Sequence, residues 1–300
     1  MKKAVVTGGA GFIGAHIARA LIDVGYETHV VDDLSDGKRD RVPEGATLHV
    51  LDVRNTSGIK EIFEGAAAVF HEAALPRVPF SIDHPQEAHD VNVNGTLSVL
   101  LAAKEAGVSR VIYAASSSAY GEQATLPLSE DMPALPVNPY GLHKYIGECY
   151  ARMFSELYGL ETVSLRYFNV YGSGMDPEGA YALAIPKLLQ LRAKGVPLTI
   201  TGDGTQTRDF THIRDVIRAN LLAMESPRVG KGEVINIGSG RNVSMNYLAE
   251  LIGGERVYIP ARVEAHDTLA DITRAKELLD WEPEVTLEDG IMGIRGEYGV

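Results

Sequence analysis

The sequence has almost no cysteine, no cluster of metal ligands and no apolar run long enough to span a bilayer. Its one cysteine, Cys149, excludes an intramolecular disulfide and fits a reducing compartment. Nine histidines are present, but none forms a His-x-x-x-His or His/Cys motif, so we expect no metal site. The amino terminus enters a predicted strand without a signal-peptide pattern. We therefore expect a cytoplasmic protein that has no membrane partner.

Positive charge is also scarce. The 300 residues carry a formal net charge of −12, which argues against a nucleic-acid partner because such a surface needs a basic face. The hydrophobic content of 45% is ample for a folded core. The length suits one large or two modest domains.

Short apolar runs alternate with helical patterns through the first half of the chain. Strands are predicted at 4–6, 27–31, 47–51, 67–71 and 110–114, and intervening helices include 57–64 and 85–106. This alternation predicts an α/β fold, a Rossmann doubly wound parallel sheet. Ligands of such a sheet bind at the carboxyl ends of the strands.

The alternation weakens from about residue 169. Helices are predicted at 140–158, 180–193, 213–225, 245–252, 273–279 and 287–298, and strands at 166–170, 198–201 and 234–237. We expect an NAD-binding Rossmann domain over 1–168, with 210–240 returning to it. Residues 169–209 and 241–300 are then predicted to form a smaller mixed α/β lid that binds a nucleotide sugar.

The first predicted strand is followed by Thr7-Gly-Gly-Ala-Gly-Phe-Ile-Gly14 and then by a helix. Glycines at 8, 11 and 14 allow a tight turn and close approach of the backbone to a pyrophosphate, and the helix amino terminus offers N–H donors. Asp32 ends the second strand, where a carboxylate binds a ribose 2′-hydroxyl and disfavours a 2′-phosphate. NAD is therefore favoured over NADP, although the nearby Lys38 and Arg39 keep NADP open, and an aspartate at a strand end is also a common turn former.

Tyr140 and Lys144 lie four residues apart on one predicted helix that starts after Pro139. An ammonium group beside the phenol would lower the tyrosine pKa toward neutrality and make Tyr140 a general base. The same spacing also suits an ordinary aromatic and a surface lysine. Ser116-Ser117-Ser118 follow the fifth strand at the same sheet edge, as hydroxyl donors to a substrate or as a polar turn.

Six segments appear in one order along the chain: Thr7–Gly14, Asp32, Asn92-Val-Asn-Gly-Thr96, the serine run, Tyr140-x-x-x-Lys144 and Arg166-Tyr-Phe-Asn169. Together they resemble the extended short-chain dehydrogenase/reductase family, in particular the UDP-glucose 4-epimerases of its nucleotide-sugar branch. The resemblance covers nearly the whole chain. It implies NAD as a bound cofactor and a UDP-sugar as substrate.

The resemblance also implies roles for individual residues. Tyr140 would be the base, Lys144 its partner and Ser116 the hydroxyl donor. Implied cofactor contacts are Gly8, Gly11, Phe12, Ile13, Gly14, Asp32, Asp33, Leu34, Gly37, Asp52, Val53, Ala73, Ala74, Asn92, Tyr140, Lys144 and Phe168. Implied substrate contacts are Ser116, Ser118, Tyr140, Asn169, Thr199, Arg208 and Arg262.

The serine run separates the reactions found in this branch. Relatives that dehydrate the sugar resemble Thr-Asp-Glu at Ser116–Ser118, whereas this chain has no carboxylate there. We therefore expect 4-epimerisation of a UDP-hexose, UDP-galactose to UDP-glucose, through a 4-keto intermediate. A reductase, a 4,6-dehydratase or a catalytically silent NAD-binding protein are the alternatives.

Two further expectations come from the resemblance. The family pattern Arg-x-Gly-Asp/Glu is altered at Ala261-Arg262-Val263-Glu264, where valine replaces the glycine. A homodimer is expected through the helices that contain Asn92 and Tyr140. The apolar residues Val91, Leu97, Leu100 and Leu101 suit that interface and suit core packing equally.

Overall fold

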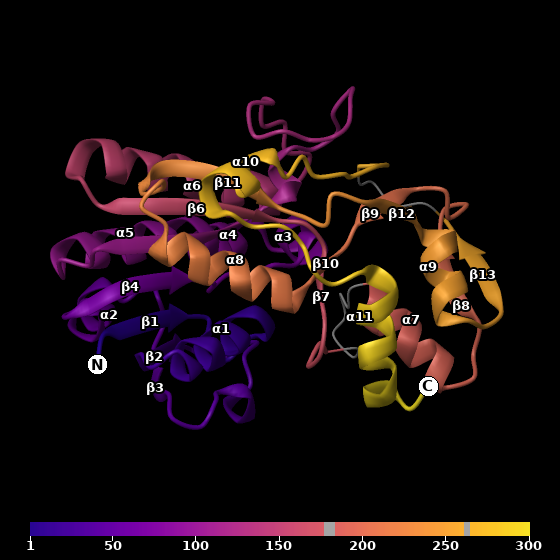
Figure 1. The fold of residues 1–300 in the computed structure, drawn as a ribbon, viewed down its shortest axis with the longest axis horizontal. Helices are drawn as coiled ribbons and strands as arrows, with labels where there is room; N and C mark the ends of the chain where they lie inside the picture. Colours follow the sequence, from indigo (N-terminus) through magenta and orange to yellow (C-terminus); the bar gives the residue numbers. More distant parts are fainter. Residues whose placement is uncertain (177–183, 261–264) are drawn as a thin grey trace.

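A seven-stranded parallel sheet forms the larger part of the protein (Figure 1). The computed structural model describes residues 1–176, 184–260 and 265–300. Across the sheet the strands run β11 (Lys231–Ile237), β6 (Glu161–Tyr167), β5 (Arg110–Ser116), β4 (Ala66–His71), β1 (Lys3–Thr7), β2 (Glu27–Asp32) and β3 (Thr47–Val50). All neighbouring strands are parallel. The strand order reverses between β1 and β4, where a doubly wound sheet binds its ligand. The predicted fold class is confirmed.

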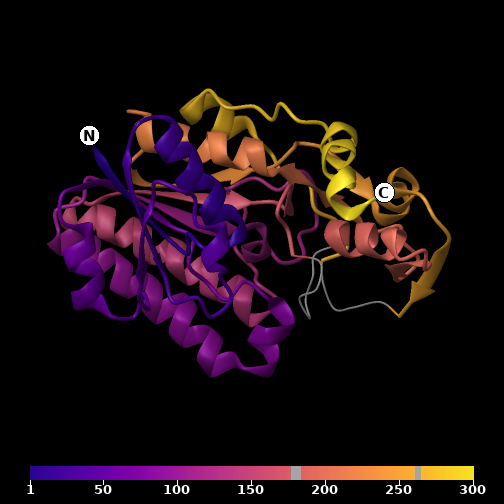
Figure 2. The ribbon, with the colours of Figure 1, turned by 90° about the horizontal axis from the view of Figure 1, so that it is seen from below.

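Helices cover both faces of this sheet (Figure 2). One face is covered by α1 (Phe12–Asp23), α8 (Ile213–Glu225) and α10 (Thr273–Leu279), and the other by α2 (Thr56–Phe63), α5 (Gly95–Glu105) and α6 (Pro139–Tyr158). Ala4 and Val6 of β1 pack in the core of the first face, whereas Val5 packs in the core of the second. Because both faces are buried, these strands are continuous apolar runs without alternation.

A smaller lobe lies beyond the carboxyl edge of the sheet, at the right of Figure 1. It contains α7 (Ala184–Ala193), α9 (Met245–Ile252), α11 (Leu287–Arg295) with a 3₁₀ turn at Gly296–Tyr298, and the parallel pair β8 (Leu198–Thr201) and β13 (Arg256–Ile259). Two short pairs join it to the main sheet: β7 (Val170–Tyr171) with β10 (Thr211–His212), and β9 (Thr207–Asp209) with β12 (Asn242–Ser244). Leucine and isoleucine side chains from the three helices and β8 form the core of the lobe.

Parts of the second half return to the main sheet. Strand β11 pairs with β6, and α8 packs beside α1, as the predicted return of 210–240 requires. Helix α10 and Trp281 also pack in the main core, and the Trp281 indole N–H donates to the Asp215 carbonyl oxygen at 2.9 Å. The stretch 273–281 therefore lies with the sheet and not with the smaller lobe.

The helix expected over 85–106 is confirmed as one continuous helical stretch, in which α4 (Pro85–His89) passes through a π-helical turn (Asp90–Asn94) into α5. It is preceded by α3 (Val78–Asp83), which was not predicted. The strand expected at 166–170 is β6, which ends at Tyr167. Asn169 has a φ of 31° and lies in the turn that leaves the sheet. Within the described residues, no helix is long and apolar enough to cross a membrane.

Candidate active site

The turn between β1 and α1 is packed so tightly that two of its glycines have no room for a side chain. Gly8 has a φ of 69°, and a Cβ there would lie 2.6 Å from the Ala73 nitrogen. A Cβ on Gly14 would lie 2.3 Å from the Gly8 oxygen. Helix α1 begins at Phe12 without a side-chain cap and without an acidic residue in its first turn. Its first N–H groups, including that of Ile13, are therefore available to an anion, which fits the pyrophosphate of a dinucleotide.

Asp32 is fixed beside this turn at the end of β2. One carboxylate oxygen accepts from the Ala10 N–H and the other from the Leu34 N–H, both at 2.9 Å. Burial raises the pKa of Asp32, while the two backbone bonds oppose that rise. Each oxygen keeps a lone pair that can accept from a ribose hydroxyl. The Lys38 ammonium lies 2.8 Å from the Asp176 carboxylate, so it is directed to that ion pair, which weakens the NADP alternative.

Other predicted cofactor residues lie on neighbouring loops. Asp33 is exposed and accepts from Ser35, and Gly37 follows in the same loop. Asp52 forms an ion pair with Arg54, whose hydrogen bond is the main cause that lowers the Asp52 pKa, and Val53 is buried.

Asn92 clamps the loop that follows β4. Its amide oxygen accepts from the Leu75 N–H at 2.7 Å, and its amide nitrogen donates to the Leu75 oxygen at 3.1 Å. Ala73 and Ala74 lie in the same loop, directly against the glycine-rich turn. Asn92 thereby orders the backbone on which a cofactor would lie.

A buried polar network beneath the site was not predicted. The His71 Nδ1 atom lies 2.8 Å from the Thr7 hydroxyl, and its Nε2 atom lies 3.0 Å from the Thr96 hydroxyl. The Thr96 hydroxyl itself donates to the backbone carbonyl oxygen of Asn92 at 2.7 Å. The single Thr96 hydroxyl proton is committed, so Nε2 must carry the ring proton and Nδ1 must accept. Burial lowers the pKa of His71 to about 3, which keeps the ring neutral. A histidine that closes an apolar strand was the available sequence signal.

The structure brings Tyr140, Ser116 and Lys144 together. Asn138 caps α6 by accepting from the Gly141 N–H at 2.9 Å, which fixes the first turn that carries Tyr140. Ser116 ends β5 and hydrogen-bonds the Tyr140 phenol. Lys144 follows one turn after Tyr140 and is buried.

The predicted lowering of the Tyr140 pKa by Lys144 is wrong for the protein chain on its own. Burial raises the pKa of Tyr140 to about 12; the Ser116 hydrogen bond opposes this rise and Glu72 adds to it. The Lys144 ammonium donates to the Ala114 oxygen at 2.7 Å, and burial lowers its own pKa to about 8. Desolvation of the phenolate is therefore the leading cause of the Tyr140 shift, and Lys144 is not among the groups that lower it.

Glu72 is a further ionisable group at this site that the sequence reasoning missed. It directly follows β4 and accepts a hydrogen bond from the Tyr167 hydroxyl at 3.0 Å. Burial raises the pKa of Glu72 to about 7, and Lys144 lowers it. A charged residue immediately after a buried strand was a signal that could have identified it.

Three of the predicted substrate residues lie at or after the carboxyl end of β5 and β6 and on β9. The Asn169 amide donates to the Asp209 oxygen at 2.7 Å, and the Arg208 guanidinium donates to the Thr207 and His266 oxygens at 2.9 and 2.8 Å. Ser118 is partly exposed beside Ser116.

The remaining predicted contacts are less accessible. Phe168 is fully buried with Tyr120, Leu128 and Ala270. The Thr199 hydroxyl on β8 is buried and has no hydrogen-bond partner within the described parts of the chain. Arg262 lies outside the described residues. In the described ranges, no group of three or more His, Cys, Asp or Glu residues could hold a metal ion.

Comparisons with known proteins agree with this geometry. Residues 4–238 match the model of the NAD dependent epimerase/dehydratase family. A putative UDP-glucose 4-epimerase of Methanocaldococcus jannaschii is 38% identical, covering 96% of this chain and 95% of the relative. A UDP-glucuronate 4-epimerase of Thermodesulfobacterium geofontis is 35% identical, covering 96% and 93%. The UDP-glucose 4-epimerase of Thermotoga maritima, solved with UDP-glucose, superposes with a TM-score of 0.94 at 38% identity and covers 99% of this chain and 98% of that one.

Proposed function

From the premise that this chain belongs to the NAD-dependent epimerase/dehydratase family, we propose that it interconverts UDP-galactose and UDP-glucose. It is an isomerase of the UDP-sugar 4-epimerase type, and NAD is its cofactor. The hexose is proposed from the relatives named for UDP-glucose, and the proposal of epimerisation rests on one observation. Tyr140, Ser116 and Lys144 meet at the carboxyl edge of the sheet, beside a serine run that offers no carboxylate.

The chain's own residues supply the binding site and the proton transfer. The α1 amino terminus would hold the pyrophosphate of NAD, Asp32 would accept from the adenosine ribose, and the cofactor would lie against the Ala73–Ala74 backbone. When bound, NAD would supply a reversible hydride acceptor for sugar C4. The remaining steps belong to side chains.

Tyr140 takes the proton of the sugar 4-hydroxyl on its phenolic oxygen and later gives it back. Ser116 donates to the same hydroxyl and orients it. Burial, together with the charge of Glu72, raises the pKa of Tyr140 to about 12 with Lys144 already in place, so ionisation of the phenol needs positive charge beyond that of the protein chain. The Lys144 ammonium on the same helix face suits the ribose hydroxyls.

The serine run argues against the elimination of water. A dehydratase needs an acid and a base near C5 and C6 of the sugar, and Ser116, Ser117 and Ser118 have neither at neutral pH. A return of hydride to the opposite face of C4 needs one proton carrier only. Epimerisation is therefore the reaction that these residues support.

The first test is proton NMR of UDP-galactose incubated with the purified protein and NAD. Conversion to UDP-glucose without net NADH supports the proposal. UDP-glucuronate and UDP-N-acetylglucosamine, run in parallel at equal concentration, rank the sugars by kcat/KM. A 4-keto-6-deoxy product or stoichiometric NADH would contradict epimerisation, and conversion of only the acidic or N-acetylated sugar would contradict the hexose assignment.

We also propose a homodimer through α5 and α6. Leu97 and Leu101 of α5 are partly exposed and line an open depression of about 490 Å³, and α6 exposes Leu142, Met153 and Leu157 at helical spacing. Leu100, by contrast, is 1% exposed and belongs to the core, and Val91 is partly buried. Light scattering at micromolar concentration is expected to give twice the monomer mass, and a monomer would refute the dimer.

The division into an NAD-binding part (1–168 with 210–240) and a sugar-binding part stays a proposal. It is supported by the separate core of the smaller lobe. The packing of α10 on the main sheet adds 273–281 to the first part.

A further inference from the structure

Glu72 lies where three elements of the candidate site meet. Its N–H donates to the Thr7 oxygen at 3.1 Å, which holds the residue at the carboxyl end of β4 beside β1. Its carboxylate accepts from Tyr167 of β6 at 3.0 Å. The Tyr167 oxygen in turn accepts from the Asn220 amide nitrogen of α8 at 2.8 Å, and the single Tyr167 proton can point either at Glu72 or at the Asn220 amide oxygen, 3.1 Å away.

Glu72 follows His71, which pairs with Tyr113 of β5, and the Lys144 ammonium donates to the oxygen of the next β5 residue, Ala114, at 2.7 Å. The Glu72 carboxyl group and the Tyr140–Lys144 pair therefore lie at the ends of two neighbouring strands. The charge of Glu72 raises the pKa of the Tyr140 phenol, because a second negative charge nearby disfavours the phenolate. It also raises the pKa of Lys144, because an anion favours the ammonium. The Glu72 charge thus favours the protonated form of both residues, the Lys144 ammonium and the neutral Tyr140 phenol.

The second carboxylate near Lys144 is already neutralised. Glu148 lies one turn after Lys144 on α6, and both its oxygens accept from the Arg166 guanidinium at 2.8 and 2.6 Å. No cation lies within ion-pair distance of Glu72 in the described part of the chain. Glu72 therefore lacks a paired cation there, whereas Glu148 is paired with Arg166; burial raises the pKa of Glu148, and the Arg166 hydrogen bonds oppose that rise.

The groups that face Glu72 come from every element packed against it. They are Lys144 and Tyr140 from α6, Tyr167 from β6, Tyr113 from β5, the neutral His71 from its own strand, the Thr7 backbone from β1 and, through Tyr167, Asn220 from α8. Lys144 is the one cation in this set.

We propose that Glu72 is a positioning residue that sets the ionisation of both Lys144 and Tyr140, and thereby the pH range in which the enzyme turns over. The inference rests on the proposed 4-epimerase function and deepens it. Glu72 does not need to touch the sugar, because it acts through charge on residues that do.

The decisive variant is Glu72→Gln, which keeps the shape and an acceptor for Tyr167 but removes the charge. Without the anion, both the phenol and the ammonium lose protons more easily. The acid and the alkaline limbs of the kcat/KM profile of the NAD-loaded enzyme should therefore both move to lower pH, by about one unit. Glu130→Gln is the matched control, since the Glu130 side chain is only 3% exposed but accepts from the Asn236 N–H and lies near Arg274. Its profile should match the wild type.

A purely structural role gives a different result. It lowers kcat or stability in Glu72→Gln and leaves both limbs in place, and that outcome overturns the proposal. Movement of the two limbs in opposite directions overturns it as well, because one removed charge cannot produce that pattern.

A second measurement separates this inference from the proposed function. The infrared C=O band that disappears in Glu72→Gln is titrated in the wild-type holoprotein and in Lys144→Met. Loss of the lysine cation should raise the midpoint of Glu72, because coupling between two ionisable groups is reciprocal. If no UDP-sugar is turned over, the proposed function fails while this titration still decides the coupling. An unchanged midpoint in Lys144→Met refutes the inference even where turnover is normal.

Discussion

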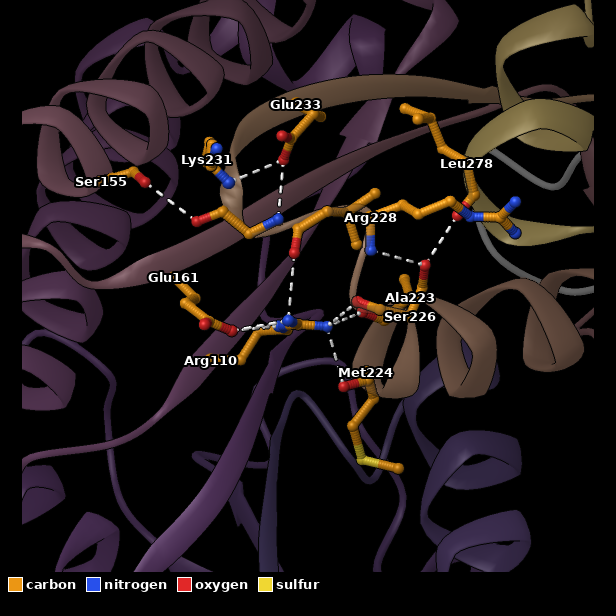
Figure 3. Close-up of polar contacts among 12 residues, drawn as sticks. Arg110, Ser155, Glu161, Ala223, Met224, Ser226, Arg228, Lys231, Glu233 and Leu278 are labelled. Atoms are coloured by element: carbon orange, nitrogen blue, oxygen red, sulfur yellow. Dashed lines mark hydrogen bonds and ion pairs between the residues drawn. The ribbon is translucent and has the colours of Figure 1, made fainter.

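The two ends of strand β5 differ in how far their buried polar groups are stabilised by partners. At its amino end Arg110, only 8% exposed, donates to the carbonyl oxygens of Ala223, Met224, Ser226 and Val229 at 2.9–3.0 Å and to Glu161 at 2.8 Å (Figure 3). The first three carbonyls end helix α8, where a cation is favoured by the helix dipole. Every donor direction of the guanidinium fork is used, so this end is fully satisfied.

At the carboxyl end, β5 stops at Ser116 among groups whose preferred ionisation states conflict. Tyr140, Lys144 and Glu72 have pKa values of about 12, 8 and 7, and burial is the leading cause of each shift. Such conflict costs folding free energy, but it leaves groups that exchange protons near neutral pH. The comparison indicates that stability is concentrated at the amino edge of the sheet and chemistry at the carboxyl edge.

Tyr140→Phe is expected to separate activity from stability most clearly. Loss of the phenolic oxygen removes the proton carrier, so kcat should fall about 100- to 10,000-fold. Unfolding by urea should change little, because the ring remains. The experiment compares kcat and the urea midpoint of the same preparation, and near-normal turnover would exclude Tyr140 as the base.

Arg110→Met should produce the reverse pattern. Four carbonyl oxygens lose their donor, and we expect a loss of about 3 kcal/mol in the free energy of unfolding. The value of kcat, measured well below the melting temperature, should stay within about twofold because the site lies at the other end of the strand. A large fall in kcat without a loss of stability would break the proposed division between the two edges.

The pH dependence of stability should belong to the carboxyl edge as well. The His71 pKa is lowered from about 6.5 to about 3 in the folded protein, so the unfolded chain binds the extra proton as pH falls below 6.5. The stability contributed by the neutral ring is therefore present above pH 6.5 and is lost on acidification.

His71→Gln tests that contribution. Between pH 7 and 5 the stability of wild type minus variant should fall by about 2 kcal/mol. Glu72, with a raised pKa, titrates in the opposite sense, but it is common to both proteins and cancels in the difference. Urea unfolding at each pH gives the values. If the stability of the two proteins changes with pH in parallel, His71 takes up its proton as readily in the folded protein as in the unfolded chain.

A smaller effect is expected from Asn138→Ala. The variant removes the cap of α6 and should cost about 1 kcal/mol, while Asn138→Asp, which keeps an acceptor, should cost much less. Because the cap fixes the first turn that carries Tyr140, a modest fall in kcat should accompany the loss. Equal stability of the two variants would show that the hydrogen bond to Gly141 contributes nothing.

The smallest effect is expected at an exposed ion pair of the amino edge. Arg228 pairs with Asp280 at 2.5 Å, but the two side chains are 45% and 81% exposed. Arg228→Gln should change the free energy of unfolding by less than about 0.5 kcal/mol. A loss comparable to that of Arg110→Met would mean that burial does not explain the stability of this edge.

Much of the fold could be predicted because it follows from local pattern. The bounds of α8, α9, α10 and β8 agree with the sequence prediction to the residue. The five early strands were located to within about two residues at each end. Periodicity, glycine placement and caps act over a few residues, so a sequence displays them directly.

The errors arose where packing competes with local pattern. Helix α3 was not predicted, and the helix over 85–105 contains a π turn at Asn92, whose side chain hydrogen-bonds the Leu75 backbone. Leu100 suited an interface and the core equally, and the packing places it in the core. Helix α10 packs on the main sheet although it is distant in sequence.

The sequence by itself determined the class of fold, the dinucleotide turn, Asp32 and the identities of Tyr140, Lys144 and Ser116, because each depends on residue type and short spacing. Only the tertiary structure decided their ionisation. Glu72 meets a tyrosine 95 residues later, and burial reverses the expected shift of Tyr140. Desolvation and charge depend on distance in space, and no pattern along the chain reports that distance.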